Sequence, residues 1–296
     1  MYAVVKKTCR RFCNRYDNIR LSTCKIMAKS KYEYVREFES EDKCIPNCWI
    51  VVRLDGRSFH RFTMVHKFDK PNDKNALNLM NRSAVAVMDE LRDVQIAYGQ
   101  SDEYSFVLRK DTNIYNRRQS KIMSAINSIF SASYVYYWST YFKEKKLIYP
   151  PSFDARTVLY PTDQNLRDYL SWRQADTHIN NLYNTAFWGL VLKKGLNNNE
   201  AEKVLSGTVS SQKNEILYSE CGTNYNNELP IYRKGSVLIR KLVQIPPSKT
   251  KKHVVYILHE DIIGDNFWNK NTEILSLDKL RLYENIKPND IFVYMR

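Results

Sequence analysis

The stretch VQIAYGQSDEYSFVL, residues 94–108, contains two runs of apolar and aromatic residues joined by the polar segment GQSDE. The runs VQIAY and YSFVL have the composition of strands, and the link has the composition of a turn, so the stretch predicts an antiparallel β-hairpin. Two adjacent carboxylates, Asp102 and Glu103, then lie at or just past the hairpin tip. These acids require an explanation in a chain whose formal net charge is +14.

Strand and helix signals continue on both sides of the hairpin. WIVVRL (49–54) predicts a buried strand that stops at Asp55-Gly56, and residues 55–71 predict a loop. Asn72 or Asp73 can cap a following helix, and a long helix is expected over residues 116–142 before a strand at 153–160. The apolar stripe of the first helix comprises Leu77, Met80, Ala84, Val87 and Leu91.

The element order strand, helix, strand, strand, helix, strand predicts an α+β fold with a split βαβ (ferredoxin-like) layer and helices on one face. In that topology the first strand runs beside the hairpin, so Asp55 and Asp102 converge at one edge although 47 positions separate them. Further along, we expect a helix over 162–191, a short helix at 199–205, a strand at 235–243 and an exposed basic linker at 244–253.

Composition restricts the class of partner. The chain of 296 residues is 43% hydrophobic, enough for a core, and its 46 Lys and Arg against 32 Asp and Glu favour a polyanionic partner. No window is apolar enough to predict a membrane span. Residues 1–26 contain seven Lys or Arg and one acid, which is typical of either a mitochondrial transit peptide or a disordered basic arm.

Two converging carboxylates beside basic residues are suited to binding Mg2+ and a triphosphate. Mg2+ prefers oxygen ligands from one or two carboxylates, phosphates and water, so Asp55, Asp102 and the Gly56 carbonyl are candidate ligands, with Glu103 beside them. An Asp-Glu pair in a hairpin is more often a solvated turn; the joint placement with Asp55 favours the metal interpretation.

The segment HINNLYN (178–184) places His178, Asn181 and Asn184 at spacings of three residues on a predicted helix. One face then carries side chains able to bond bases or ribose. The alternative, that these amides satisfy buried backbone groups, remains open at this point.

Several segments together resemble the tRNA-His guanylyltransferase family: VVRLDGRSFHRF, KPND, AYGQSDEYSFV, YPPSFDAR, YLSWRQADTHINNLYNTAFW and NNELPIYRKGSVL. The resemblance extends from about Met27 to Val243. It implies a polymerase-like palm that works in the 3'-to-5' direction. ATP adenylylates the 5'-monophosphate of tRNA-His, and the GTP 3'-hydroxyl then attacks to add one guanylate.

The resemblance also implies roles for individual residues. It assigns two Mg2+ ions to Asp55, Gly56 and Asp102, with Glu103 as the adjacent catalytic acid. A nucleotide cradle is implied for Asp55, Gly56, Arg57, Ser58, Phe59 and His60 together with Ser101 and Asp102. Basic triphosphate contacts are implied for Lys70, Arg118 and Lys121, and tRNA contacts for His178, Asn181, Asn184 and Lys213.

The expected organisation is a leader (1–26), a palm-like catalytic domain (27–160) and a helical and mixed C-terminal region (161–296) for tRNA handling and oligomerisation. The resemblance implies a homotetramer, and the expected location is the cytoplasm, with mitochondrial targeting if the leader functions. Three other functions stay open. They are templated 3'-to-5' repair of tRNA 5' ends, nucleotide cyclisation and non-catalytic RNA binding.

Overall fold

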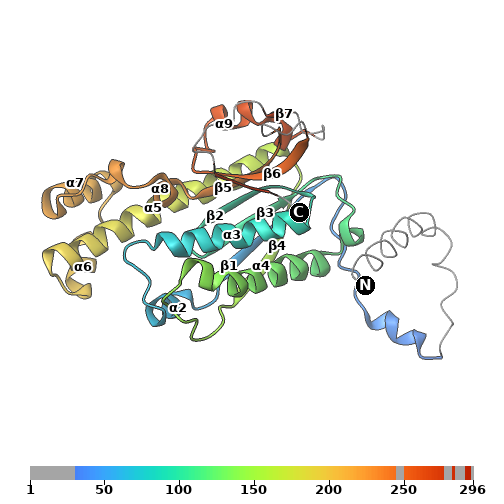
Figure 1. Cartoon of the computed structure of the whole chain (residues 1–296), viewed down its shortest axis with the longest axis horizontal. Coiled ribbons are helices and arrows are strands. Elements are labelled where there is room, and N and C mark those ends of the chain that lie inside the picture. The colour runs from blue at the N-terminus through green and yellow to red at the C-terminus, as the bar shows by residue number, and fades with distance from the viewer. Residues whose placement is uncertain (1–30, 245–249, 277–281, 284–290, 295–296) are drawn as a thin grey trace, which may run out of the picture. The chain divides into compact units, whose positions relative to one another are not determined.

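The computed structural model describes residues 31–244 and 250–276 and the backbone of two further segments, 282–283 and 291–294 (Figure 1). The chain divides into two compact units, Met1–Glu41 and Asp42–Arg296. The described part of the first unit contains one short 3-10 helix, η2 (Glu33–Phe38), which has no buried residue. The proposed leader, residues 1–26, lies outside the described residues.

The second unit is built on one eight-stranded sheet with the order β4-β1-β3-β2-β5-β6-β8, and β7 pairs with β5. Adjacent strands in this order are antiparallel, and β7 runs parallel to β5. The strands are β1 (Trp49–Gly56), β2 (Val94–Gln100), β3 (Glu103–Leu108), β4 (Phe153–Tyr160), β5 (Ser236–Gln244), β6 (Lys251–Leu258), β7 (Leu282–Tyr283) and β8 (Ile291–Tyr294). The predicted hairpin is confirmed, and so is the first strand running beside it in the middle of the sheet.

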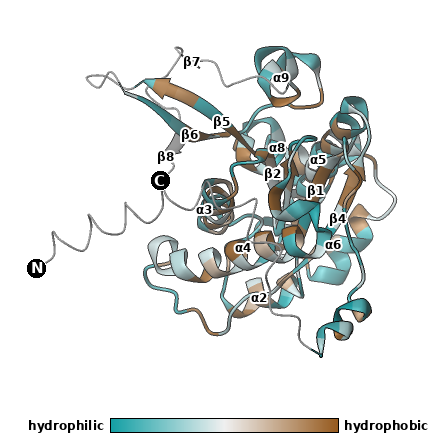
Figure 2. Cartoon of the chain, turned by 90° about the vertical axis from the view of Figure 1, so that its right-hand side faces the viewer, coloured by the Kyte–Doolittle hydropathy of each residue, from teal (hydrophilic) through white to brown (hydrophobic). Residues whose placement is uncertain are grey.

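Alternating residues of the central strands form separate cores on the two faces of the sheet. On one face, Ile50, Val52 and Leu54 of β1 pack in a cluster with α3 (Lys74–Glu90) and α4 (Gln119–Tyr141). On the other face, Trp49 and Val51 pack with the first half of α5 (Asp163–Lys194). Figure 2 shows hydrophobic residues concentrated along β2 and β5. Helices therefore cover both faces, whereas the sequence predicted them on one.

The long helix α5 links the sheet to a smaller helical cluster. Thr162 caps its start by accepting a hydrogen bond from the Asn165 backbone N–H, and Gly195 ends it in the left-handed conformation at φ +75. Its C-terminal half packs against α6 (Asn198–Leu205) and α7 (Ser210–Cys221), as Figure 1 shows. Further helical segments after α7 are η4 (Tyr225–Asn227), α8 (Pro230–Lys234), α9 (Asp265–Lys270) and η5 (Thr272–Ile274).

Three local expectations need correction. The predicted loop at 55–71 contains the helix α2 (Phe59–Val65), whose Phe59 and Phe62 are buried. The long helix predicted from 116 begins at Gln119, after the 3-10 helix η3 (Ile114–Arg117). The predicted linker includes Lys251–His253 at the start of β6, because these residues pair with β5; residues 245–249 of that linker lie outside the described residues. No helix in the described ranges is both long and apolar enough to cross a membrane.

Candidate active site

Three carboxylates meet where β1 and β2 end and β3 begins. Asp55 lies opposite Glu103 in the β1–β3 ladder, and Asp102 lies in the two-residue link between β2 and β3. The Gly56 N–H donates a hydrogen bond of 3.1 Å to the Asp102 carbonyl. The predicted convergence of Asp55 and Asp102 therefore describes the fold correctly, and Glu103 lies beside them.

The backbone at this edge is closely packed. A Cβ added at Gly56 would lie 2.5 Å from the Phe59 ring and 2.8 Å from Asp102 Oδ2. Because real Cβ atoms do not approach other atoms so closely, any larger residue at position 56 would force the Phe59 or Asp102 side chain to shift. After it, Ser58 adopts a left-handed conformation at φ +53 and turns the chain into α2.

Burial dominates the electrostatics of the acids. It raises the pKa of Asp102 to about 6, and the nearby charge of Asp55 adds to this effect. Burial also raises the pKa of Glu103, opposed by Arg173 and Arg53. A partly desolvated pair of like charges favours a bound cation, so the residues present are suited to a divalent metal.

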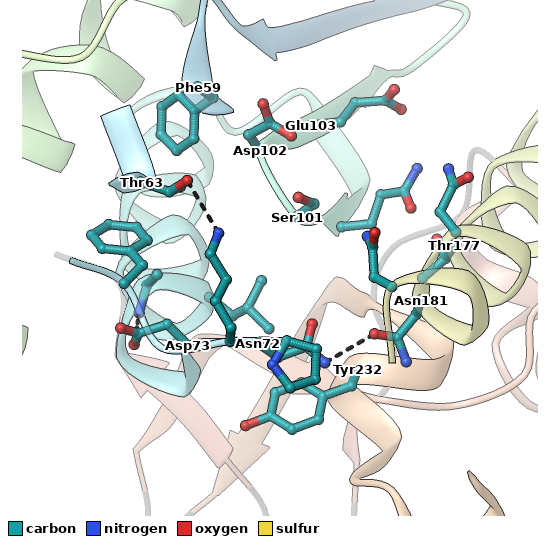
Figure 3. Close-up of a pocket in the computed structure, with 18 of the residues that line it drawn as sticks. Phe59, Thr63, Asn72, Asp73, Ser101, Asp102, Glu103, Thr177, Asn181 and Tyr232 are labelled. Atoms are coloured by element: carbon teal, nitrogen blue, oxygen red, sulfur yellow. Dashed lines mark hydrogen bonds between the residues drawn. The ribbon is translucent and has the colours of Figure 1, made fainter. Parts of the chain in front are cut away.

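The carboxylates form one end of a pocket of about 720 Å³. Figure 3 shows Asp102 and Glu103 across the pocket from Thr177 and Asn181 of α5, with Phe59 and Thr63 of α2 on a third side. The lining also includes Tyr183, Asn184, Phe187, Trp188 and Glu202. This volume is within the range of small-molecule sites.

Most of the predicted nucleotide cradle lines this pocket. Its lining includes Asp55, Phe59, His60, Ser101, Asp102 and Lys70. The Lys70 ammonium lies 3.5 Å from Thr63 Oγ1 and 5.6 Å from the centre of the Trp188 ring, and burial lowers its pKa. Arg57 and Ser58 line a separate hollow of about 280 Å³ instead.

Two predicted basic contacts lie elsewhere in the fold. The backbone of Arg118 forms an isolated antiparallel β-bridge with Lys43, which precedes β1 in the chain. The ammonium of the exposed Lys121 lies 5.2 Å from the centre of the Tyr115 ring. Asp55 is near the other end of β1, roughly 20 Å away at the rise of an extended strand. The fold of one chain therefore does not bring Arg118 and Lys121 to the carboxylates.

The predicted tRNA-contacting residues differ in their surroundings. Asn181 is buried, donates to Tyr225 Oη at 3.0 Å and accepts from Asn72 Nδ2 at 3.0 Å. Asn184 is exposed and lines the pocket. The pKa of His178 is lowered, mainly because the side chain is partly buried and also because the positive charge of Arg233 is nearby. Lys213 donates to the Thr208 carbonyl at 2.5 Å. Asn181 thus links the side chains of Tyr225 and Asn72, and it also lines the pocket.

The sequence interpretation missed Arg173. Its guanidinium donates to Glu103 Oε2 at 3.0 Å, and both side chains are largely buried. A signal was present, because Leu166, Tyr169, Leu170, Arg173 and Thr177 follow helical spacing on one buried face of α5. A charged residue on such a face requires a partner.

Within the described residues, no group of three or more His, Cys, Asp and Glu side chains is arranged to hold a metal. Asp55 and Asp102 supply two carboxylates, which matches the way Mg2+ binds when phosphates and water complete its coordination.

The chain is similar to known proteins over most of its length. Residues 32–161 match the family model described as tRNAHis guanylyltransferase, and residues 164–264 match the model of the Thg1 C-terminal domain. The chain is 54% identical over 268 residues to a probable tRNA(His) guanylyltransferase of Homo sapiens, covering 85% of this chain and 90% of that protein. It is 50% identical to the tRNA(His) guanylyltransferase of Schizosaccharomyces pombe, covering 82% and 96%.

Solved structures show the same likeness. The crystal structure of tRNA(His) guanylyltransferase from Saccharomyces cerevisiae superimposes with a TM-score of 0.68 at 50% identity, covering 71% of this chain and 93% of that chain. A bacterial Thg1-like protein in complex with ATP has a TM-score of 0.64 at 20% identity, covering 82% and 97%, and shows a common fold.

Proposed function

Because the chain belongs to the tRNA(His) guanylyltransferase family and is a nucleotidyltransferase, we propose that it adds a guanylate to the 5' end of tRNA-His. The observation that carries this proposal is the convergence of Asp55 and Asp102 at one end of a pocket of about 720 Å³. The net charge of +14 suits a tRNA partner, whose phosphates dominate affinity.

The proposed reaction has two nucleotidyl-transfer steps. The 5'-monophosphate of the tRNA attacks the α-phosphate of ATP, and pyrophosphate leaves. The 3'-hydroxyl of GTP then attacks the activated 5'-phosphate, losing its proton as AMP departs. Asp55, Asp102 and the Gly56 carbonyl would hold two Mg2+ ions, which when bound activate the attacking oxygen and stabilise the leaving oxygen. Lys70, on the pocket wall, presents an ammonium to the phosphates.

The strand order β4-β1-β3-β2, with α3 and α4 on one face, supports a split βαβ, ferredoxin-like palm over residues 27–160. We assign tRNA handling and oligomerisation to residues 161–296 and propose a homotetramer, which light scattering after size-exclusion chromatography would test. We also propose a cytoplasmic location, with mitochondrial targeting through residues 1–26.

Incorporation of labelled GTP into a 5'-monophosphorylated tRNA-His transcript tests the function. With Mg2+ and ATP, the wild type should add one guanylate, and Asp102→Ala should lose at least about 10²-fold in rate. Asp154→Ala is the matched control. Asp154 lies opposite Asp55 in the β1–β4 ladder, yet its exposed side chain is outside the pocket. Tight tRNA binding without incorporation would contradict the proposal, and equal incorporation without ATP would contradict the adenylylation step.

A further inference from the structure

The ion pair between Arg173 and Glu103 connects the long helix α5 to the ends of the central strands, where the three carboxylates lie. Arg173 Nη1 lies 3.0 Å from Glu103 Oε2, and the two side chains are only 6% and 14% exposed. Glu103 is adjacent to Asp102 and opposite Asp55. The carboxylate that Arg173 binds is therefore the third member of the acidic cluster.

Arg173 is held in place by its own surroundings. Its guanidinium lies 3.5 Å from the centre of the Trp172 ring, and Asp176 is 3.5 Å from Nη1. The next residue, Gln174, fixes α5 by donating to the Lys234 and Glu260 carbonyls and accepting from the Ile262 N–H. Arg173 thus projects from a firmly anchored part of the helix.

The nearby Arg53 does not provide the same support. It affects Glu103 through its charge, and the Nε atoms of both Arg53 and Arg173 are buried without a hydrogen-bond partner in the structure. Among the described residues, it is Arg173 whose side chain donates a hydrogen bond to the Glu103 carboxylate. Figure 3 shows the Glu103 carboxylate turned away from Asp102.

We propose that Arg173 is a positioning residue for nucleotidyl transfer, holding Glu103 on the α5 side of the site so that Asp55 and Asp102 alone face the metal and the triphosphate. A bound cation attracts every nearby carboxylate and offsets their mutual repulsion. Without Arg173, Glu103 is free to turn toward a cation held by Asp55 and Asp102 and to bind it in an unproductive arrangement. This inference rests on the proposed function for its catalytic readout.

The test uses Arg173→Met and Arg173→Lys in the full-length protein, with Arg167→Met as the matched control. Arg167 lies on the same helix and pairs with Asp265, whose side chain is 77% exposed, away from the pocket. Four quantities are measured: Mn2+ affinity by electron paramagnetic resonance without substrates, tRNA affinity by filter binding, kcat for guanylate addition, and thermal stability by thermal unfolding.

For Arg173→Met we expect Mn2+ binding about tenfold tighter, since a positive charge is lost and a carboxylate is freed, while kcat falls about 10²-fold. Affinity for tRNA should be unchanged. Arg173→Lys should restore most of kcat, and Glu103→Gln combined with Arg173→Met should return Mn2+ affinity toward the wild-type value.

Two results would overturn the proposal. Mn2+ affinity that is unchanged or weaker in Arg173→Met, with kcat and thermal stability falling together, would show a purely structural role. Weaker tRNA binding with unchanged kcat would instead make Arg173 an RNA contact. If the wild type adds no guanylate, the proposed function fails, and the Mn2+ measurement still tests the position of Glu103.

Discussion

Gly56 and Asp102 approach each other so closely that their backbones are hydrogen bonded at 3.1 Å and a methyl group on Gly56 would lie 2.8 Å from Asp102 Oδ2. The same methyl group would meet the Phe59 ring at 2.5 Å. The spacing of β1 from the hairpin tip therefore depends on the absence of a side chain at one position.

Gly56→Ala should abolish guanylate addition and reduce the free energy of unfolding by about 1–3 kcal/mol, because Phe59 or Asp102 must move. Activity assays and urea denaturation measure the two effects. Gly264→Ala is the control, since Gly264 has φ −76 and no atom within 4 Å of an added Cβ. Wild-type activity in Gly56→Ala would contradict the geometry.

Asp102→Asn should make the protein more stable and inactive. Burial raises the pKa of Asp102 from 3.8 to about 6 in the folded chain, so the folded state binds this proton more tightly than the unfolded state. Ionised Asp102 therefore destabilises the fold, an effect absent below about pH 4 and complete above about pH 6.

In EDTA at pH 8, Asp102→Asn should gain about 1–3 kcal/mol in the free energy of unfolding. The gain should largely disappear at about pH 3, which is below both pKa values, because Asp102 is then mostly protonated in both states. Urea unfolding at the two pH values decides this, and an equal gain at both would refute the electrostatic explanation.

Tyr134→Phe should leave stability unchanged or raise it by about 1 kcal/mol. The Tyr134 hydroxyl is buried without a hydrogen-bond partner in the structure, and its ring packs against Phe59, Phe62 and Phe153. The substitution keeps these contacts and removes an unsatisfied polar group. Thermal unfolding measures the change, and a loss above about 1 kcal/mol would show that the hydroxyl has a partner.

Arg240→Met should destabilise the protein by about 3–5 kcal/mol. The buried Arg240 guanidinium donates to the Val94 carbonyl at 2.7 Å, to the Leu91 carbonyl at 2.9 Å and to Met88, so it joins β5 to the end of α3 and the start of β2. Exposed Arg92→Met, in the segment that Arg240 contacts, is the control for loss of charge alone. Similar small effects for both variants would contradict the role of Arg240.

The acidic part of the site was predictable because it depends on local signals. Strand-like runs and a turn fix where β2 and β3 end, and a known topology places β1 beside them. Asp55 and Asp102 are at strand ends, so their convergence follows from the strand order.

Other parts depended on tertiary pairing. The basic residues Lys251–His253 resemble a linker in composition and become a strand through pairing with β5. The pocket wall formed by α5 could not be predicted, since the packing angle of a helix is not encoded in its periodicity. The position of Arg118, by contrast, could have been inferred, because β3 leads away from Asp102 before α4 begins.

The shared sheet also limits how this chain can be shortened. The two family models match residues 32–161 and 164–264 separately, yet β5 from the second segment pairs with β2 from the first over Ile96–Gly99. A recombinant fragment ending at residue 161 would expose the backbone edge of β2, where Ile96, Ala97 and Tyr98 are buried in the whole protein. Such an edge recruits other chains, so the fragment should aggregate during expression instead of folding as a separate catalytic module.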